Sequence, residues 1–477
     1  MTPSHIKYQR RPPQHAVTTS RDVANGIADV KNNAPLTLKW MLRHLKKGIQ
    51  LLLRHPLTVL GFICRHPKKF FLAPSAQRKG AVRRTFLSRL LGRRDSVKLA
   101  PELDAEIMSL VGDNTVFFEV TYPGRIGHLA GEIDLWLREH ALAAEPTKKH
   151  VLILNADEAA NAHFLAYCQE HFQFVISKQL WTFLLHTFPK LKSCYHMRKD
   201  YFHAFDESAK CYPIYASWAD RPPLFKLNAT DRTHLSTTLS NWGFGANDWF
   251  VCIHNREKGY SPGDDSLHDY RNANIETFTL AIQEIVSRGG WVIRMGDPSM
   301  TPLPKMEHVV DYAHSEFRNP RLDVLLCASA RCFIGCSSGL AFLATAFGVP
   351  VAMVNLTPMS TLAPGALDLS IPKLYYAEDE KRTLTFEEVL SSDLGNLRFS
   401  HEYRDLGVRI LDNDAEDILA ITKEILESTS EKRPRDEEND RLQAAFLSLI
   451  KPGHYGFGST ARVGRAFLSK HHDLLGL

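Results

Sequence analysis

Polar residues close successive apolar runs between residues 250 and 356. The groups in question are Arg256, Arg294, Asp311, the segment Ser337-Ser338-Gly339, and Asn355. Arginine offers fixed, bidentate hydrogen-bond donors that suit a diphosphate. Ser-Ser-Gly directly before a helix adds hydroxyl and backbone N–H groups at the positive end of the helix dipole. The residue types therefore predict an anion-binding site for a diphosphate.

The pattern of elements explains why these residues should meet. The apolar runs are typical of strands covered on both faces, and they alternate with helical segments. The strands are expected at 249–253, 291–293, 308–310, 332–335 and 350–354, with helices at 275–288, 323–330 and 340–347. Such a parallel sheet binds ligands at the carboxyl ends of its strands. We expect one crevice there, to which Arg271 and Asn272 of a polar loop and Gly296 also contribute. Taken singly, Arg256 and Arg294 are equally compatible with salt bridges at the sheet edge.

A second site candidate lies in an N-terminal turn. The strand-like run 116–120 leads into Gly124-Arg125-Ile126-Gly127-His128, and a helical pattern follows from Ala130 to about Glu139. Strand, glycine-bearing turn and helix form the opening unit of a Rossmann-type fold. His128 at that turn is a candidate general base or acceptor contact, and helix capping is the alternative. Further strands are expected at 150–155 and 174–176.

Charge stabilisation by arginine needs no acidic metal ligands. A nucleoside diphosphate that leaves a sugar develops negative charge, which arginines and a helix N-terminus can stabilise without Mg²⁺. No Asp-x-Asp motif stands where a metal-dependent transferase would place one, and Asp264-Asp265 lies in a Gly/Pro-bearing loop. The sequence therefore predicts no metal and no other cofactor.

Several segments resemble a family of bacterial glycosyltransferases associated with surface-polysaccharide and related glycan loci. They are residues 251–256, 270–272, 290–296, 311–313 and 334–339, in an order and spacing that match over roughly 225–427. The turn 124–129 also resembles the first turn of that family. More loosely, His254-x-Arg256 after a strand is similar to fucosyltransferase-type enzymes of the GT-B fold. This resemblance implies that Arg256 holds the donor diphosphate.

The first hundred residues carry most of the positive charge. They contain 21 Lys and Arg against 3 Asp and Glu, a net +18, so the remaining 37 and 50 give −13 and the whole chain +5. An amphipathic helix is expected after Pro35, with Leu38, Leu42 and Leu45 on one face and lysines and arginines on the other. Residues 36–95 could therefore contact an anionic membrane surface, and the alternative is a helix packed on the body of the protein. Nucleic acid is disfavoured, because the segment lacks interleaved aromatic residues.

Composition adds limits of its own. The apolar patch 57–64 is too short for a membrane span, and the sequence shows no signal-peptide pattern. The eight cysteines form no CxxC pair and several lie in apolar runs, which is typical of reduced core residues in a cytoplasmic protein.

Together these features predict an α/β chain with two Rossmann-like domains facing a cleft, in the GT-B manner. The expected parts are a basic extension at 1–100, an acceptor domain at 101–240, a donor domain at 241–427, and a linker with C-terminal helices at 428–477. The predicted function is metal-independent transfer of a sugar from a nucleotide-sugar donor to a glycan, lipid-linked or protein acceptor, in the cytoplasm or on the inner face of the membrane. The alternatives are a sugar-nucleotide epimerase or hydrolase on the same fold, and a non-catalytic sugar- or membrane-binding scaffold.

Overall fold

The computed structural model describes residues 115–143, 148–172, 174–178, 181–182, 185, 195–197, 201–202, 208–259, 265–429 and 436–476. The basic extension, with its expected amphipathic helix and membrane-facing residues 36–95, lies outside these ranges. Nearly all the described residues from 116 onward belong to one compact unit. Of a second unit the structure describes Thr115 and a few residues from 175 to 185, among which Val175 and Trp181 are buried.

The N-terminal sheet has the strand order β3-β2-β1-β4, and β1 and β4 run parallel. Its strands are β1 (Thr115–Glu119), β2 (Lys149–Ile153), β3 (Phe174–Ile176) and β4 (Tyr195–Met197). Helix α6 (Ile126–Leu142) connects β1 to β2, and α7 (Ala162–His171) connects β2 to β3. The strand–turn–helix unit predicted around residues 116–139 is confirmed, and its helix is longer than predicted at both ends.

A seven-stranded, all-parallel sheet follows, in the order β14-β10-β9-β8-β5-β6-β7. The predicted strands appear as β5 (Phe250–His254), β6 (Trp291–Arg294), β7 (Val309–Val310), β8 (Phe333–Gly335) and β9 (Val351–Leu356). β10 (Leu369–Pro372) and β14 (Arg462–Val463) extend the sheet and were not predicted. The central strands β5, β8 and β9 are buried along their whole length, which explains their continuous apolar sequences.

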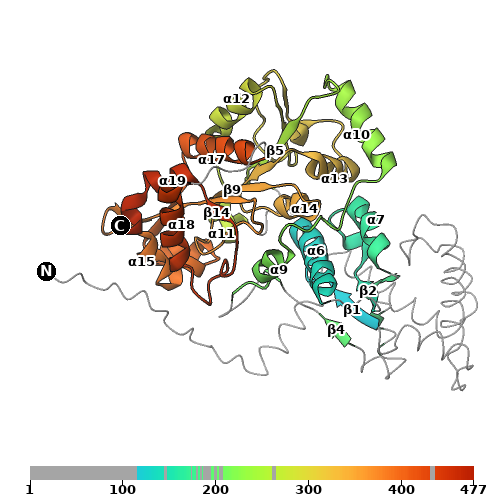
Figure 1. The fold of residues 1–477 in the computed structure, drawn as a ribbon, viewed down its shortest axis with the longest axis horizontal. Coiled ribbons are helices and arrows are strands. Elements are labelled where there is room, and N and C mark those ends of the chain that lie inside the picture. The colour runs from blue at the N-terminus through green and yellow to red at the C-terminus, as the bar shows by residue number, and fades with distance from the viewer. Residues whose placement is uncertain are drawn as a thin grey trace, which may run out of the picture. The chain divides into compact units, whose positions relative to one another are not determined.

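Helices connect and flank this sheet. The set comprises α9 (Cys211–Trp218), α10 (Ala229–Asn241), α12 (Thr279–Ser287), α13 (Pro320–Ser329), α14 (Leu340–Ala346) and α17 (Ala415–Ser428). α12 and α17 pack side by side, and the helices of the N-terminal sheet pack on those of the larger sheet, α6 against α14 and α7 against α13 (Figure 1). α/β architecture with parallel sheets, the coarse prediction from the alternating pattern, is confirmed.

The C-terminal part differs from the prediction in one place. A small antiparallel sheet in the order β12-β11-β13 is present where no strands were predicted. Its strands are β11 (Leu374–Ala377), β12 (Arg382–Thr383) and β13 (Val408–Leu411). Its neighbours are the short helices α11 (Asp265–His268), α15 (Phe386–Leu390) and α16 (Ser400–Asp405). Within the predicted linker and C-terminal helices at 428–477, α18 (Glu437–Leu449) begins directly after Asp436, whose side chain caps it. The last helix is α19 (Arg465–Lys470).

Two further properties concern the described residues alone. No described helix has the length and apolar character needed to cross a membrane. The six described cysteines are free and buried, in agreement with their interpretation as reduced core residues.

Candidate functional site

The topology of the seven-stranded sheet marks one place for a ligand. The chain leaves β5 for β6 and β7 on one side and then returns to β8, which pairs with β5 on the other side. His254 at the end of β5 is the register partner of Gly335 at the end of β8. Doubly wound sheets bind ligands at such a switch point, outside the carboxyl ends of the two diverging strands. The segments after His254 and after Gly335 are those that carry the predicted arginine and serines.

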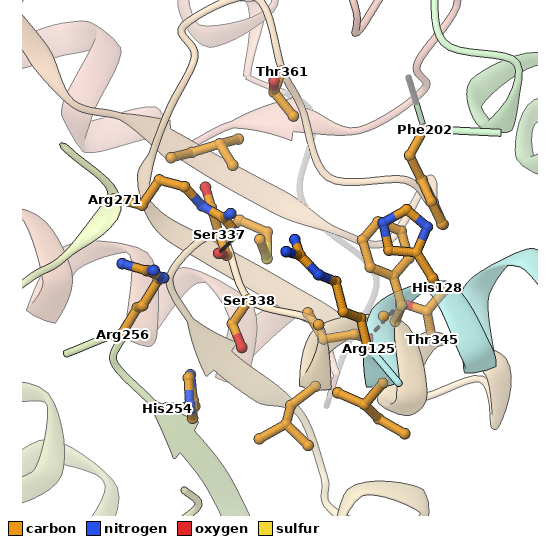
Figure 2. Close-up of a pocket in the computed structure, with 18 of the residues that line it drawn as sticks. Arg125, His128, Phe202, His254, Arg256, Arg271, Ser337, Ser338, Thr345 and Thr361 are labelled. Atoms are coloured by element: carbon orange, nitrogen blue, oxygen red, sulfur yellow. Dashed lines mark hydrogen bonds between the residues drawn. The ribbon is translucent and has the colours of Figure 1, made fainter. Parts of the chain in front are cut away.

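A pocket of about 840 Å³ opens at this point. Seven of the eleven predicted site residues line it: His128, Arg256, Arg271, Gly296, Ser337, Ser338 and Gly339. Figure 2 shows Arg256, Arg271, Ser337 and Ser338 gathered on one side and His128 on the other. The structure thus brings together residues that are far apart in the sequence; His128 and Gly339 are 211 positions apart.

Arg256 and Arg271 are half-buried and bonded to neutral oxygens. The Arg256 guanidinium donates to the His268 carbonyl at 3.1 Å and to Asn272 Oδ1. Arg271 donates to the carbonyl oxygen of Ser337, and it forms no ion pair with any described residue. The acceptor of Arg271 is uncharged, so this bond orients the Arg271 guanidinium without neutralising it, which suits the binding of an anion in the pocket.

The two serines differ in their surroundings. Ser337 Oγ donates to the carbonyl of Thr357 at 3.2 Å and accepts the Thr357 N–H at 3.3 Å, which ties the loop after β8 to the end of β9. Ser338 is half-buried and makes no side-chain hydrogen bond within the described part of the chain. Of the pair, Ser338 is therefore the one whose hydroxyl is available to a ligand.

Arg294 requires a correction. The sequence placed it in the diphosphate site, but its side chain is fully buried and does not line the pocket. Its guanidinium lies 3.0 Å from Glu257 Oε1 and 3.3 Å from Asp311 Oδ1. Asp311 in turn accepts the Leu303 N–H at 2.9 Å. Arg294 and Asp311 thus form a buried ion network beneath the site, which is the salt-bridge alternative that the sequence left open.

Asn272 and Asn355 are also structural in this geometry. Asn272 does not line the pocket; its side chain accepts from Arg256 and its carbonyl accepts from Lys373 Nζ at 2.6 Å. Asn355 is fully buried with a φ of 51°, and its backbone and side chain exchange two hydrogen bonds with Asn413, at 2.6 and 2.7 Å. Both were predicted to bind the ligand; neither lines the pocket, and their hydrogen bonds join neighbouring loops.

Gly339 has a packing role that the sequence did not indicate. A Cβ atom on Gly127 would lie 2.8 Å from Gly339 Cα, and one on Gly339 would lie 2.6 Å from the Gly127 nitrogen. The first turn of α6 therefore touches the backbone that precedes α14, and the two glycines permit this approach. Since α14 has only seven residues, Gly339 is better explained by this contact than by anion binding at a helix N-terminus.

His128 is paired with a buried carboxylate. Its Nδ1 lies 2.5 Å from Glu132 Oε1, one helical turn further along α6, and Glu132 is fully buried. The other oxygen of Glu132 accepts the Thr121 N–H at 2.8 Å. The ring of His128 sits between Tyr122 and Phe202, with centroids 4.9 and 5.5 Å away. Carboxylate pairing fixes the proton on Nδ1, so Nε2 is the basic nitrogen. The helix-capping alternative is not what is seen, because α6 has no side-chain cap.

The pocket lining also includes residues that were not predicted as part of the site, among them Arg125, His254 and Arg398. Burial lowers the pKa of His254 to about 4, with the Arg294 charge as a second cause. Its Nδ1 has no hydrogen-bond partner within the described part of the chain, although the side chain is only 6% exposed. The Arg398 guanidinium lies 3.8 Å from the centroid of the Tyr455 ring. Arg125 is three positions before His128, and His254 is two positions before Arg256. Their places in the predicted turn and at the end of the predicted strand could therefore have indicated them, whereas no sequence pattern pointed to Arg398.

The described residues contain no group of three or more His, Cys, Asp or Glu side chains that could hold a metal ion.

Comparisons with known proteins give distant similarities. No protein-family model matches the sequence, and no curated protein matches it. Among solved structures, the chain is similar to a glycosyl transferase of family 9 from Veillonella parvula, with a TM-score of 0.34 and 10% identity over 51% of this chain and 80% of that one. It is also similar to the E. coli ADP-heptose LPS heptosyltransferase II, with a TM-score of 0.34 and 10% identity over 50% and 84% of the two chains.

A third similar structure is the iron-containing dodecameric glycosyltransferase TibC from enterotoxigenic E. coli. Its TM-score is 0.30 at 16% identity, over 50% of this chain and 57% of that one. At identities of 10–16% and TM-scores of 0.30–0.34, such likeness carries no argument about activity.

Proposed function

We propose that this chain is a glycosyltransferase that moves a sugar from a nucleotide-sugar donor to a hydroxyl group of an acceptor. One observation carries the proposal. The switch point between β5 and β8 presents Arg256 and Ser338 to a pocket whose other wall carries the His128–Glu132 pair. Cations for a diphosphate and a base for a hydroxyl group are the two requirements of sugar transfer from such a donor.

The proposed step is a direct displacement at the anomeric carbon of the donor sugar. The acceptor oxygen forms a bond to this carbon as the bond from the carbon to the β-phosphate oxygen breaks, and the bonding electrons stay with the phosphate. The proton of the acceptor hydroxyl passes to Nε2 of His128. Arg256 and Arg271 stabilise the additional negative charge on the departing nucleoside diphosphate, in a pocket partly shielded from water.

The finer parts of the proposal follow from the same residues. The pocket would lie between an acceptor half, built on the N-terminal sheet, and a donor half in the GT-B manner. The reaction would need no metal ion, because arginines supply the charge that Mg²⁺ supplies elsewhere. We therefore expect transfer to continue undiminished in excess EDTA, and a loss of activity that Mg²⁺ or Fe²⁺ restores would contradict this part.

Donor binding tests the proposal directly. We expect one class among UDP-, GDP-, CMP-, dTDP- and ADP-sugars to raise the melting temperature, since a ligand at 100 times its dissociation constant stabilises a protein by about 2.7 kcal/mol. The Arg256→Ala variant should lose the shift. Arg288→Ala is the matched control, because Arg288 pairs with Glu284 on α12 and does not line the pocket. No shift with any donor, or an equal shift in Arg256→Ala, would refute the assignment.

The proposal also places the enzyme in the cytoplasm, on the inner face of the membrane, with a glycan, lipid-linked or protein acceptor. The membrane location is inferred from the positive charge of residues 36–95. The full chain should sediment with vesicles containing anionic lipid, and replacement of Lys39, Arg43, Lys46 and Lys47 by Glu should release it. Sedimentation that is unchanged by this replacement would remove the membrane from the proposal.

A further inference from the structure

Arg125 enters the pocket from the N-terminal sheet. It is exposed, it precedes α6, and it lines the same pocket as Arg256 and Arg271, which come from the larger sheet. Figure 2 shows its side chain directed toward Ser337 and Ser338, with Arg256 and Arg271 beyond the serines. Three guanidiniums from three separate elements thus face one volume.

The backbone fixes Arg125 in that position. Its N–H donates to the Tyr122 carbonyl at 3.0 Å, and its carbonyl accepts the Leu129 N–H at 2.9 Å. Two residues further on, Gly127 touches Gly339, the neighbour of Ser338. The same contact that joins α6 to α14 therefore sets the origin of the Arg125 side chain beside the serine loop.

The balance of charge in the pocket favours an anion at this place. Positive side chains gathered around one cleft raise the electrostatic potential there and attract anions. The acidic side chains that line the pocket have other partners: Glu257 pairs with Arg294, Asp323 accepts the Tyr312 hydroxyl at 3.0 Å, and Asp297 accepts the Ser299 N–H at 2.9 Å. The pocket lining nevertheless carries an excess of positive charge, because five arginines face three carboxylates: Arg125, Arg256, Arg271, Arg318 and Arg398 against Glu257, Asp297 and Asp323.

A surface interaction with Tyr122 is the competing explanation for Arg125. The guanidinium carbon lies 5.7 Å from the centroid of this ring, and Tyr122 is 47% exposed. A cation–π contact near the outer limit of about 6 Å at an exposed ring is weak. Such a contact affects stability slightly and has no reason to affect turnover.

We propose that Arg125 is a catalytic residue that contacts the diphosphate of the donor. The inference rests on the proposed glycosyltransferase function and adds a residue from the opposite sheet to it. As the bond between the anomeric carbon and the β-phosphate oxygen breaks, Arg125 stabilises the charge that remains on that oxygen. Arg256 and Arg271 hold the diphosphate in the ground state from the side of β5 and β8. The donor diphosphate is thereby contacted from both walls of the pocket. Its departure from the sugar depends on Arg125, which the N-terminal sheet positions.

Steady-state kinetics of Arg125→Ala with the donor that shifts the melting temperature test this inference. We expect kcat to fall about 10²-fold, the size of effect seen when one donor to a developing oxyanion is removed. The KM for the donor and the donor-induced shift should change far less, because Arg256 and Arg271 remain. Arg125→Lys should recover part of the lost rate, since the charge returns without the bidentate geometry.

Two control variants separate this role from surface stacking. Arg221→Ala is matched to Arg125→Ala, because the Arg221 guanidinium lies 5.6 Å from the Trp218 ring but outside the pocket lining; it should leave kcat unchanged. Arg125→Leu keeps an apolar side chain against the Tyr122 ring and removes the charge. A wild-type kcat in Arg125→Leu would overturn the inference in favour of stacking.

The outcomes also separate this inference from the proposed function. A wild-type chain that binds and transfers a sugar, with Arg125→Ala turning over at the wild-type rate, would overturn the role of Arg125 alone. A wild-type chain that no nucleotide-sugar stabilises would overturn both. Loss of kcat confined to Arg125→Ala, with its donor shift retained, supports both.

Discussion

Glu132 determines what His128 can do. The carboxylate is fully buried, bonds to His128 Nδ1 and to the Thr121 N–H, and so fixes the ring in one orientation. It acts through His128, and we regard it as a positioning residue. In Glu132→Gln the amide oxygen can still accept from Thr121, but the charge that favours the imidazolium during proton transfer is lost. We expect kcat to fall about 10²-fold in steady-state kinetics. The donor-induced shift of the melting temperature should stay the same, because donor binding is intact. Unaltered kcat would exclude His128 as the base.

Replacement of Arg294 should affect the stability of the protein, whereas replacement of Glu132 should affect its turnover. Because it neutralises Glu257 and Asp311 from a fully buried position, Arg294→Met leaves two carboxylates without their cation. Removing one partner of a buried ion pair destabilises a protein by about 3–5 kcal/mol. Urea unfolding of Arg294→Met should show such a loss, whereas Arg256→Ala should lose donor binding with a smaller change in stability. A loss below about 1 kcal/mol in Arg294→Met would contradict the buried network.

These two arginines show how far residue types alone can lead. Arg256 and Arg294 both follow apolar strands, and their sequence context is the same in kind. They differ because β6 lies where its arginine meets Glu257 and Asp311, while the end of β5 faces the switch point. Which carboxylate neutralises which arginine depends on register between strands, and local sequence carries no information about it.

At the scale of elements, the contact between α6 and α14 can be tested directly. Neither Gly127 nor Gly339 can carry a side chain without moving the other backbone, since an added Cβ would lie only 2.6–2.8 Å from it. Gly127→Ala should therefore lower the free energy of unfolding by about 1–3 kcal/mol and reduce kcat, because the turn that carries Arg125 and His128 must shift. Gly245→Ala is the control: its nearest neighbour would be Asp248 Oδ1 at 3.4 Å, an ordinary contact. Equal stability of the two variants would contradict the close approach.

Elements were predictable where the pattern was local. The apolar runs that became β5, β6, β8 and β9 are short, continuous and bounded by glycine or polar residues, which identifies buried parallel strands. The antiparallel sheet around Leu374–Ala377 was missed because its strands alternate weakly and pair through a partner, Val408–Leu411, that is distant in the sequence. Gly127 was noted as a turn residue, but its packing partner, Gly339 before α14, is distant in the sequence and left no local signal.

At the scale of the whole molecule, acid should destabilise the fold through its histidines. Burial lowers the pKa of His171, His254, His454 and His471 below the usual value. A histidine with a lowered folded-state pKa takes up its proton more readily when unfolded, so stability falls as the pH drops below about 6.5. Asp134 acts in the opposite sense over the same range, because burial raises its pKa to about 6 and protonation then favours the folded state. Burial also raises the pKa of Asp323. Carboxyls with a lowered pKa, among them Asp231, Glu257 and Glu388, add to the effect of the histidines, and we expect a net loss of stability in acid.

His254 allows this expectation to be measured at one residue. Its folded-state pKa of about 4 lies below the unfolded value near 6.5, so the unfolded chain binds one more proton between these limits. Stability should fall by about 1.4 kcal/mol for each pH unit in that window on account of this group, about 3 kcal/mol in all. The slope of the unfolding free energy against pH can be measured by urea titration between pH 4.5 and pH 6.5. In His254→Gln this slope should be smaller than in the wild type by about 1.4 kcal/mol per pH unit. His401→Gln, at an exposed position on α16, is the control and should keep the wild-type slope. Identical slopes in wild type and His254→Gln would mean that His254 is hydrated in solution and that the pocket is wetter at the end of β5 than its geometry indicates.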